Sequence, residues 1–186
     1  MATNIRKIAF ELLRSYEEEG RYVNLLLSAP KVAALSKEER SAVTALLYTA
    51  VEKKMTYDYF IAAFSKRPIN EIDPYVRDVL RIGMCQILDM KSIPDFAAVN
   101  ESVKLARHKG EAGFVNAVLR AVSRSKEQLP YPKREKNLAR FLSVYYSVPL
   151  PTVKLFMSIV GEAEPNNTLR EILQDFSHAW DTEAVP

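Results

Sequence analysis

Apolar residues recur at helical spacing through most of this sequence. The stretch GFVNAVLRAV, residues 113–122, gives the pattern most clearly, because residues three and four apart share one face of a helix. One face is aliphatic and comprises Val115, Val118, Leu119 and Val122. The other face is polar and repeats every four residues, at Asn116, Arg120 and Arg124. We therefore predict an amphipathic helix with one buried and one exposed face.

Helix start signals and the same periodicity predict further helices. Ser36 followed by Glu39 has the form of a capping box, and Asp73 before Pro74 is typical of an N-cap and first helical residue. The helix that begins at Pro74 is apolar on much of its circumference, so we place it at the centre of the core. Other predicted helical segments are residues 5–20, 36–50, 60–64, 94–106, 138–146 and 153–160, and residues 23–27 form a short apolar segment.

The order of these segments predicts an all-α protein. No stretch alternates apolar and polar residues as a strand would, and no internal repeat is present. We expect a helical bundle in residues 1–126, a linker with a helical extension in residues 127–164, and an acidic, mobile tail in residues 165–186. Pro130 and Pro132, with charges beside them, predict a hinge in the linker.

Composition narrows the class of protein. Hydrophobic residues make up 48% and charged residues 26% of the 186 positions, which is typical of a folded globular domain. A single cysteine, Cys85, excludes an internal disulfide framework and fits a reducing compartment. There is no signal peptide pattern, and no apolar stretch approaches the roughly 18 residues of a membrane span. We therefore expect a soluble cytoplasmic protein that does not bind membranes.

The net charge of +3 conceals an asymmetry along the chain. Residues 161–186 contain six acidic residues against one arginine, which leaves 25 basic and 17 acidic residues, a net charge of +8, in residues 1–160. Such a surplus attracts polyanions such as RNA, although many basic proteins bind none.

The sequence contains no recognisable catalytic motif. It has no P-loop, no glycine-rich dinucleotide turn and no GxSxG motif. His108 and His178 are far apart, and neither has a metal-ligand spacing with Cys85. Because Cys85 lies inside the predicted core helix, we expect a buried, inert thiol rather than a nucleophile. We therefore predict that this chain alone is noncatalytic and holds no cofactor or metal.

Several motifs resemble a known family of RNA-binding domains. They are, in order, RKIAFELLRSYEEEGRYVNLLL, LSKEERSAVTALLYTAVEKKMTYDYFI, IPDFAAVNESVKLA and GFVNAVLR. Residues 4–126 resemble the NusB-type helical domain, and more narrowly that domain where it opens the RsmB (Sun/Fmu) family of 16S rRNA cytosine-5 methyltransferases. A weaker likeness continues through residues 142–164 to the connection with the next domain of that family.

The sequence also departs from that family. The family's catalytic domain binds S-adenosylmethionine and attacks cytosine with a cysteine, and the resemblance implies that neither element has room in this chain. Cys85 lies in the NusB-like part, so it does not take the nucleophile's role. Phe96 stands where the resemblance leads us to expect a histidine, so a polar contact should be missing there.

The resemblance implies RNA contacts for part of the polar face of residues 113–124. Arg120 and Arg124 are predicted phosphate contacts, because the fork of an arginine presents two parallel donors to phosphate oxygens. For Asn116, two interpretations remain open, a contact with RNA or a hydrogen bond to a neighbouring backbone carbonyl.

Two further pairs of basic residues are candidate RNA contacts. Arg6 and Lys7 match the basic N-terminal segment through which NusB-like domains touch RNA. Arg107 and Lys109 stand near the end of the preceding predicted helix, where they either contact RNA or stabilise the carbonyl end of the helix dipole.

Three hypotheses for the function follow. The first is an RNA-binding module, the NusB-like domain of an RsmB-type methyltransferase that positions 16S rRNA for a catalytic domain absent from this chain. The second is a standalone NusB-like antitermination factor that binds RNA together with a small ribosomal protein. The third is a protein-interaction bundle that has lost RNA binding. RNA binding separates the first two from the third.

Overall fold

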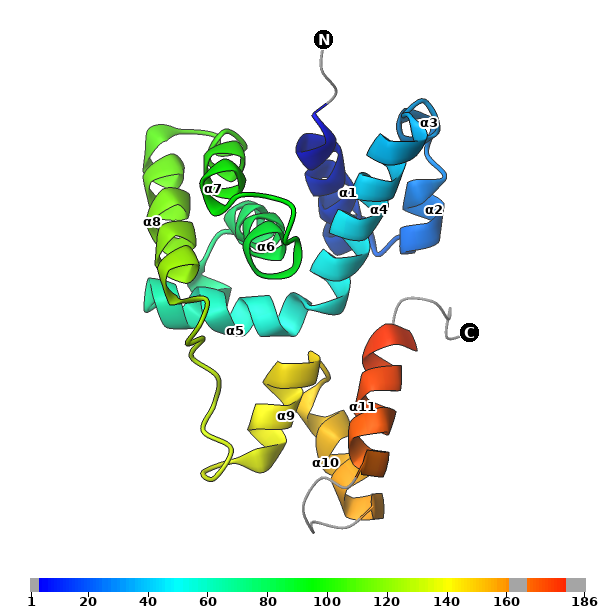
Figure 1. The fold of residues 1–186 in the computed structure, drawn as a ribbon, viewed down its shortest axis with the longest axis vertical. Helices are drawn as coiled ribbons and strands as arrows, with labels where there is room; N and C mark the ends of the chain where they lie inside the picture. Colours follow the sequence, from blue (N-terminus) through cyan, green and yellow to red (C-terminus); the bar gives the residue numbers. More distant parts are fainter. Residues whose placement is uncertain (1–3, 161–166, 180–186) are drawn as a thin grey trace.

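The computed structural model describes residues 4–160 and 167–179, and within them the chain forms helices and no strand (Figure 1). The all-α prediction is confirmed. The elements, with η1 a short 3-10 helix, are α1 (Ile5–Glu19), α2 (Val23–Leu27), α3 (Pro30–Ala33), α4 (Lys37–Glu52), α5 (Lys54–Ser65), η1 (Ile69–Glu71), α6 (Pro74–Asp89), α7 (Asp95–Val103), α8 (Lys109–Ser125), α9 (Leu138–Tyr146), α10 (Leu150–Val160) and α11 (Asn167–Ala179).

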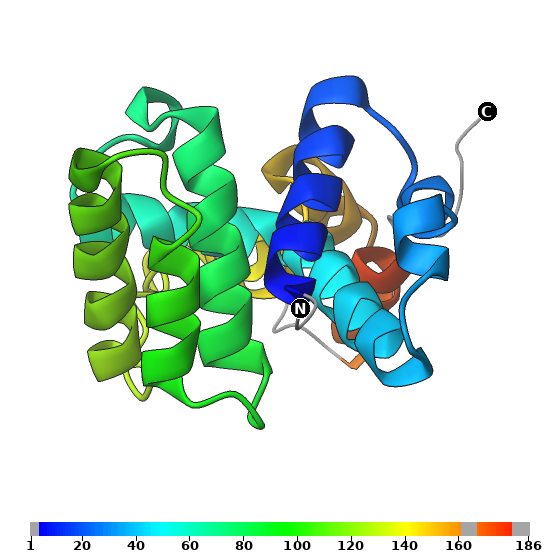
Figure 2. The same ribbon diagram turned by 90° about the horizontal axis from the view of Figure 1, so that it is seen from above.

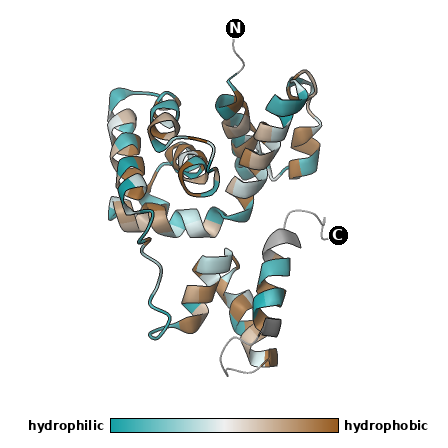
Figure 3. Cartoon of the chain, in the orientation of Figure 1, coloured by the Kyte–Doolittle hydropathy of each residue, from teal (hydrophilic) through white to brown (hydrophobic). Residues whose placement is uncertain are grey.

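Helices α1 to α8 form one body around α6. Helices α1 and α4 pack together on one side of α6, while α7 and α8 pack on its other side and on each other (Figure 2). Helix α5 runs across one end of this arrangement and contacts both α6 and α8. Figure 3 shows hydrophobic and hydrophilic residues sharing most of these helices, as expected for amphipathic helices with one face in the core.

The predicted helix starts at Ser36 and Asp73 are confirmed. The Ser36 hydroxyl accepts a hydrogen bond from the Glu39 amide at 3.2 Å, and the Glu39 carboxylate accepts one from the Ser36 amide at 3.0 Å. Asp73 accepts from the amides of Tyr75 and Val76 at the start of α6. These side chains satisfy amides that a helix start would leave without partners.

Helix α6 is buried almost all round, as predicted from its apolar circumference. Residues 78–87 are all buried, and they include three polar side chains: Asp78, Arg81 and Gln86. At Gly83, an added Cβ would lie 2.4 Å from a methyl group of Leu119 on α8. The glycine therefore permits the close approach of α8 to α6.

The guanidinium of Arg81, with only 3% of the side chain exposed, joins three helices. It donates to both carboxylate oxygens of Asp58 on α5 at 2.7 Å and to Asp78 on α6 at 2.8 Å, and it lies 3.3 Å from Glu17 on α1. Burial alone would raise the pKa of Glu17, but the charges of Arg81 and Lys54 hold it below its ordinary value. The pKa of Asp78 is raised, because burial outweighs its two arginine neighbours.

Helices α9 to α11 form a second, smaller body with its own core. Its buried side chains are Leu142, Val148, Val153, Leu169 and Leu173. The body docks on α5, where the Thr56 hydroxyl donates to the Val144 carbonyl at 2.5 Å and the Met55 amide donates to the Ser147 hydroxyl at 3.0 Å. The predicted helical extension is therefore attached to the bundle through α5 as well as through the chain.

The structure differs from the sequence expectations at three places. No helix was predicted in residues 165–186, but residues 167–179 form α11, because leucines at i and i+4 bury its inner face against α9 and α10. The rest of that segment lies outside the described residues. Helix α7 ends at Val103 and α8 begins at Lys109, so the predicted helix 94–106 is shorter and the next one longer. The linker is irregular, but Tyr131 packs edge-on against Phe60 at 5.0 Å, which anchors the predicted hinge.

Replacing Arg81 by methionine tests the three-helix junction. The variant nearly keeps the volume of the side chain, but it leaves Asp58 without its cation and Asp78 with Arg14 alone, so we expect a loss of about 3–5 kcal/mol in the free energy of unfolding. Urea denaturation measures this. Lys31→Met, which breaks an exposed 3.1 Å pair with Glu11, is the matched control and should change stability by less than about 1 kcal/mol. Equal effects of the two variants would contradict a structural role for Arg81.

The reactivity of Cys85 tests the packing of α6. The thiol is fully buried, and burial raises its pKa to about 12. A thiol reagent at pH 8 should therefore label native protein only as fast as the protein opens, and should label the protein in urea at once. Native labelling at the rate seen in urea would show that Cys85 is accessible and that α6 is misplaced.

Candidate nucleic-acid interface

The seven predicted RNA-contact residues fall on two parts of the bundle. Arg6 and Lys7 lie in the first turn of α1, whereas Arg107 precedes α8 and the other four are on α8. Helices α1 and α8 pack against different sides of α6 rather than on each other (Figure 2). The two groups therefore form separate basic surfaces held at a fixed spacing by α6.

The basic start of α1 is only partly committed to internal contacts. Asn4 caps the helix by accepting a hydrogen bond from the Lys7 amide at 3.1 Å. Arg6 donates from Nε to the side-chain oxygen of the buried Gln86 at 2.5 Å. Within the described residues, the exposed ammonium of Lys7 has no acidic partner. Lys7 thus remains available to a phosphate, while Arg6 is held against α6 with part of its guanidinium exposed.

On α8, Asn116 and Arg120 form a pair across one helical turn. The Asn116 side-chain oxygen accepts from Arg120 Nε at 2.8 Å, a partner that we did not consider from the sequence. The NH2 group of Asn116 is still able to donate to RNA, so this RNA contact stays a prediction. The bond from Nε orients the exposed guanidinium of Arg120 and leaves its two terminal nitrogens free. The exposed Arg124 and Lys109 have no ion-pair partner in the described part of the chain. Their charges are uncompensated.

Arg107 makes several contacts within the fold. Its position differs from the one that we expected, and so does its effect on the helix dipole. It lies in the loop before α8, not at the end of α7, so it cannot stabilise the carbonyl end of that helix. Its amide and its Nε each donate to the Glu111 carboxylate at 2.9 Å, its Nη2 lies 3.0 Å from Asp73, and its guanidinium stacks 4.5 Å from the ring centre of Tyr75. Hydrogen bonds from Arg107 lower the pKa of Glu111.

Lys109 needs the same correction as Arg107. It is the first residue of α8, at the positive end of that helix dipole, so the proposed stabilisation of carbonyls by its charge is wrong.

Phe96, which takes the place of the expected histidine, lies in the first turn of α7 with 72% of its surface exposed. It supplies an apolar surface where we expected a polar contact to be missing.

Two hollows that the sequence did not predict meet at the loop of residues 89–93, here named the 89–93 loop. The larger, of about 1020 Å³, lies between the starts of α1 and α4 and is bordered by Arg6, Lys37 and Lys91. The second lies between the 89–93 loop, α5 and the linker. Sequence reasoning missed Lys37 and Lys91 because neither belongs to a periodic polar stripe. These two residues could have been found by searching for basic residues in predicted loops and at predicted helix starts.

The described residues offer binding surfaces and no metal site. Among residues 4–160 and 167–179, no three His, Cys, Asp or Glu side chains are grouped so that they could hold a metal ion. Within the same residues, no helix has the length and apolar character to cross a membrane.

Comparisons with known proteins establish the family. A model described as the NusB family matches residues 3–124, which is about two thirds of the chain and spans α1 to α8. The chain belongs to the NusB family. The resemblance stated from the sequence motifs is confirmed, and the matched residues include both basic surfaces of this NusB-family domain, with Arg124 at the last matched position.

The NusB-family chain is also similar to longer proteins. It is 39% identical over 163 residues to a probable ribosomal RNA small subunit methyltransferase B of Bacillus subtilis and 31% identical over 163 residues to one of Synechocystis. Each match covers 86% of this chain and 36% of the relative. A Thermus thermophilus ribosomal RNA small subunit methyltransferase B is 34% identical over 120 residues, or 63% of this chain and 29% of the relative. The chain thus spans about a third of the length of these relatives.

The charge of Arg107 should control the titration of Glu111 in this NusB-family domain. In Arg107→Gln the hydrogen bonds to the carboxylate are lost, so the pKa of Glu111 should rise toward its ordinary value. A depressed carboxyl pKa favours folding above the ordinary pKa, and this benefit is lost as the pH falls; the variant should therefore lose less stability on acidification than the wild type does. Carboxyl NMR titration measures the pKa. An unchanged Glu111 pKa would mean that the pair does not exist in solution.

Proposed function

We propose that this chain is an RNA-binding domain that holds structured 16S rRNA for the methyltransferase reaction named in its relatives. The proposal rests on how far along the chain the similarity to these relatives extends. The matches to the Bacillus subtilis and Synechocystis methyltransferases cover 163 residues, more than the 122 residues matched by the family model, so they extend beyond α8 into the second body. A likeness to the NusB domain alone would stop near α8.

The distribution of charge supports RNA as the ligand. Cations that serve the fold, such as Arg81 and Arg107, are surrounded by carboxylates, whereas Lys7, Lys109 and Arg124 are exposed without acidic partners among the described residues. An unpaired surface cation can neutralise a phosphate and release a counterion without first breaking an internal ion pair. The two basic surfaces therefore suit the sugar–phosphate backbone.

The geometry of α8 suits shape recognition rather than the reading of bases. Arg120, oriented by Asn116, and Arg124 lie one helical turn apart on a rigid helix packed on α6 and α7. Structured RNA is recognised largely through phosphates and 2′-hydroxyl groups because its deep, narrow major groove excludes side chains. The domain would supply affinity for the RNA and fix the position of the RNA on the protein. The catalytic activity of its relatives needs parts that these contacts do not provide.

The double variant Arg120→Gln with Arg124→Gln tests the α8 surface. It removes two phosphate donors and keeps helix propensity, so the affinity for a 16S rRNA fragment should fall while the melting temperature stays nearly constant. The dependence of log affinity on log salt should flatten by roughly 0.7–0.9 for each lost contact. Lys7→Gln should act in the same direction by one contact. Fluorescence anisotropy at several salt concentrations measures both quantities.

Two variants serve as controls for this experiment. Arg107→Gln removes one positive charge, as each half of the double variant does, but from an arginine that is already paired with acids, so the salt slope should not change. Val118→Ala removes buried methyl groups and should lower stability by roughly 1–3 kcal/mol without changing the slope of the folded fraction. If the wild type binds no RNA, a protein-interaction bundle replaces the proposed function. If it binds but the α8 variant is unchanged, α8 is only a solvated surface.

A further inference from the structure

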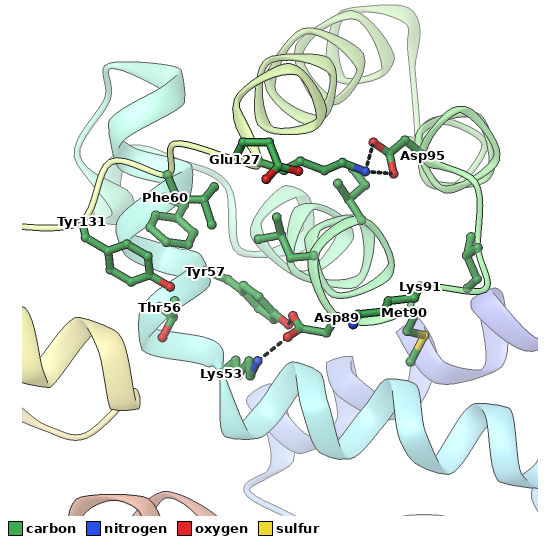
Figure 4. Close-up of a pocket in the computed structure, with 15 residues that line it drawn as sticks. Lys53, Thr56, Tyr57, Phe60, Asp89, Met90, Lys91, Asp95, Glu127 and Tyr131 are labelled. Carbon is green, nitrogen blue, oxygen red and sulfur yellow. Dashed lines mark hydrogen bonds and ion pairs between the residues drawn. The ribbon is translucent and has the colours of Figure 1, made fainter. Parts of the chain in front are cut away.

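A second hollow, of about 400 Å³, lies where the bundle meets the linker (Figure 4). Its walls come from α5, the end of α6, the 89–93 loop, the start of α7 and residues 126–131 of the linker. The linker lies outside residues 3–124, so the hollow depends on a segment beyond the family match. Its volume is within the range of about 300–1,000 Å³ that is typical of small-ligand sites.

One wall of the hollow is aromatic. Tyr57 and Phe60, both buried, come from α5, and the half-buried Tyr131 of the linker packs edge-on against Phe60. Figure 4 shows these three rings on the same side of the hollow. The Tyr57 hydroxyl donates to Asp89 at 2.5 Å, and burial raises the pKa of this tyrosine, so it stays protonated and the wall is fixed. Such a wall suits a flat ring, since every nucleobase has a face that can stack on an aromatic side chain.

Most charges at the edge of the hollow are already paired. Asp89 accepts from Tyr57 and Lys53, and Asp95 accepts from Lys126 at 3.0 Å. The exceptions are Lys91 and Glu127, which are exposed and make no hydrogen bond or ion pair to any described residue. Lys91 offers a cation to a phosphate, and Glu127 offers an acceptor to an N–H group of a base. The free groups thus match the two ends of a nucleotide.

The hollow shares the 89–93 loop with the larger one beside α1. Both are lined by Asp89, Met90, Lys91 and Ile93 of the 89–93 loop. Beyond Lys91, the larger hollow adds Arg6 and Lys37 at its border. Cations therefore continue from the aromatic wall toward the start of α1. This path suits the phosphates of a single strand better than a lone phosphate, because successive phosphates need successive cations.

We propose that the hollow of about 400 Å³ binds one nucleotide, with the base against the ring of Tyr131, an N–H group of the base toward Glu127 and the phosphate at Lys91. The inference rests on the proposed function and deepens it, because it assigns an unpaired nucleotide of the RNA to a pocket away from α8. A free mononucleotide has the same chemistry as a nucleotide of an RNA strand. The test therefore includes both sources.

The test uses GMP and a single-stranded octaribonucleotide as probes, followed by amide NMR spectra of the whole chain. We expect both to shift resonances of Tyr57, Lys91 and Tyr131, with the octamer binding more tightly if an RNA strand is the source. Tyr131→Ala should weaken binding by about five- to a hundredfold, the range that corresponds to 1–3 kcal/mol of stacking per base. Lys91→Gln should weaken binding about tenfold, as expected for about 1.4 kcal/mol from one charge-assisted contact.

Lys133→Gln, an exposed lysine of the same linker outside the hollow, is the matched control and should bind both probes as the wild type does. Tyr131→Ala also removes a ring contact with Phe141 of the second body, whereas Lys91→Gln tests the pocket and leaves that contact in place. Unshifted resonances at millimolar GMP and saturating octamer, or wild-type binding by Lys91→Gln, would overturn the proposal. Binding of the 16S rRNA fragment is a separate readout, so the pocket can fail while the proposed function stands.

Discussion

The buried guanidinium of Arg81 sets the frame on which the other features of this domain depend. A cation that is 97% buried must be matched by carboxylates, and here they come from α1, α5 and α6. The match fixes the mutual orientation of the three helices. Helix α1 then places its basic start beside the end of α6, and α5 provides both the docking surface for α9 and one wall of the aromatic hollow. A shift of α5 would alter all of these sites together.

The same electrostatic reasoning separates structural cations from candidate functional ones. Arg14, Lys54, Arg81 and Arg107 have acidic partners within the fold, so their charges are largely neutralised there. Exposed cations for which no acidic partner occurs among the described residues include Lys66, Lys133 and Lys154. Others gather at the start of α1, on the 89–93 loop and on α8. Because the fold does not require these charges, a polyanionic ligand is the simplest physical reason for placing them on three exposed surfaces. The case for RNA rests on this contrast more than on the net charge.

Local features of the fold were predictable from sequence, and long-range ones were not. The capping box at Ser36 and the stripe of α8 depend on residues three to four positions apart, which a sequence displays directly. Arg81 contacts partners 23 and 64 positions away in the sequence, so the three-helix junction could not be predicted from local patterns. The polar residues of α6 were not predicted to be buried ion-pair partners, because they stand among apolar residues. Arg107 was misassigned because the end of α7 was placed too late.

The candidate site shows the same division. The exposed arginines of α8 were found from their spacing, whereas the hollows at the 89–93 loop depend on five segments that only the tertiary structure brings together. The comparisons added the family and the likeness to rRNA methyltransferases, and neither specifies which residues meet RNA.

The most direct test of the account is a map of the RNA contacts. Photo-cross-linking of a 4-thiouridine-labelled 16S rRNA fragment to the whole chain, followed by mass spectrometry of the peptides, would provide it. The account predicts cross-links in the first turn of α1, in the 89–93 loop and on α8, where cations without an internal partner gather. Cross-links confined to α10 and α11, or equal labelling around Lys31 and other internally paired lysines, would contradict it.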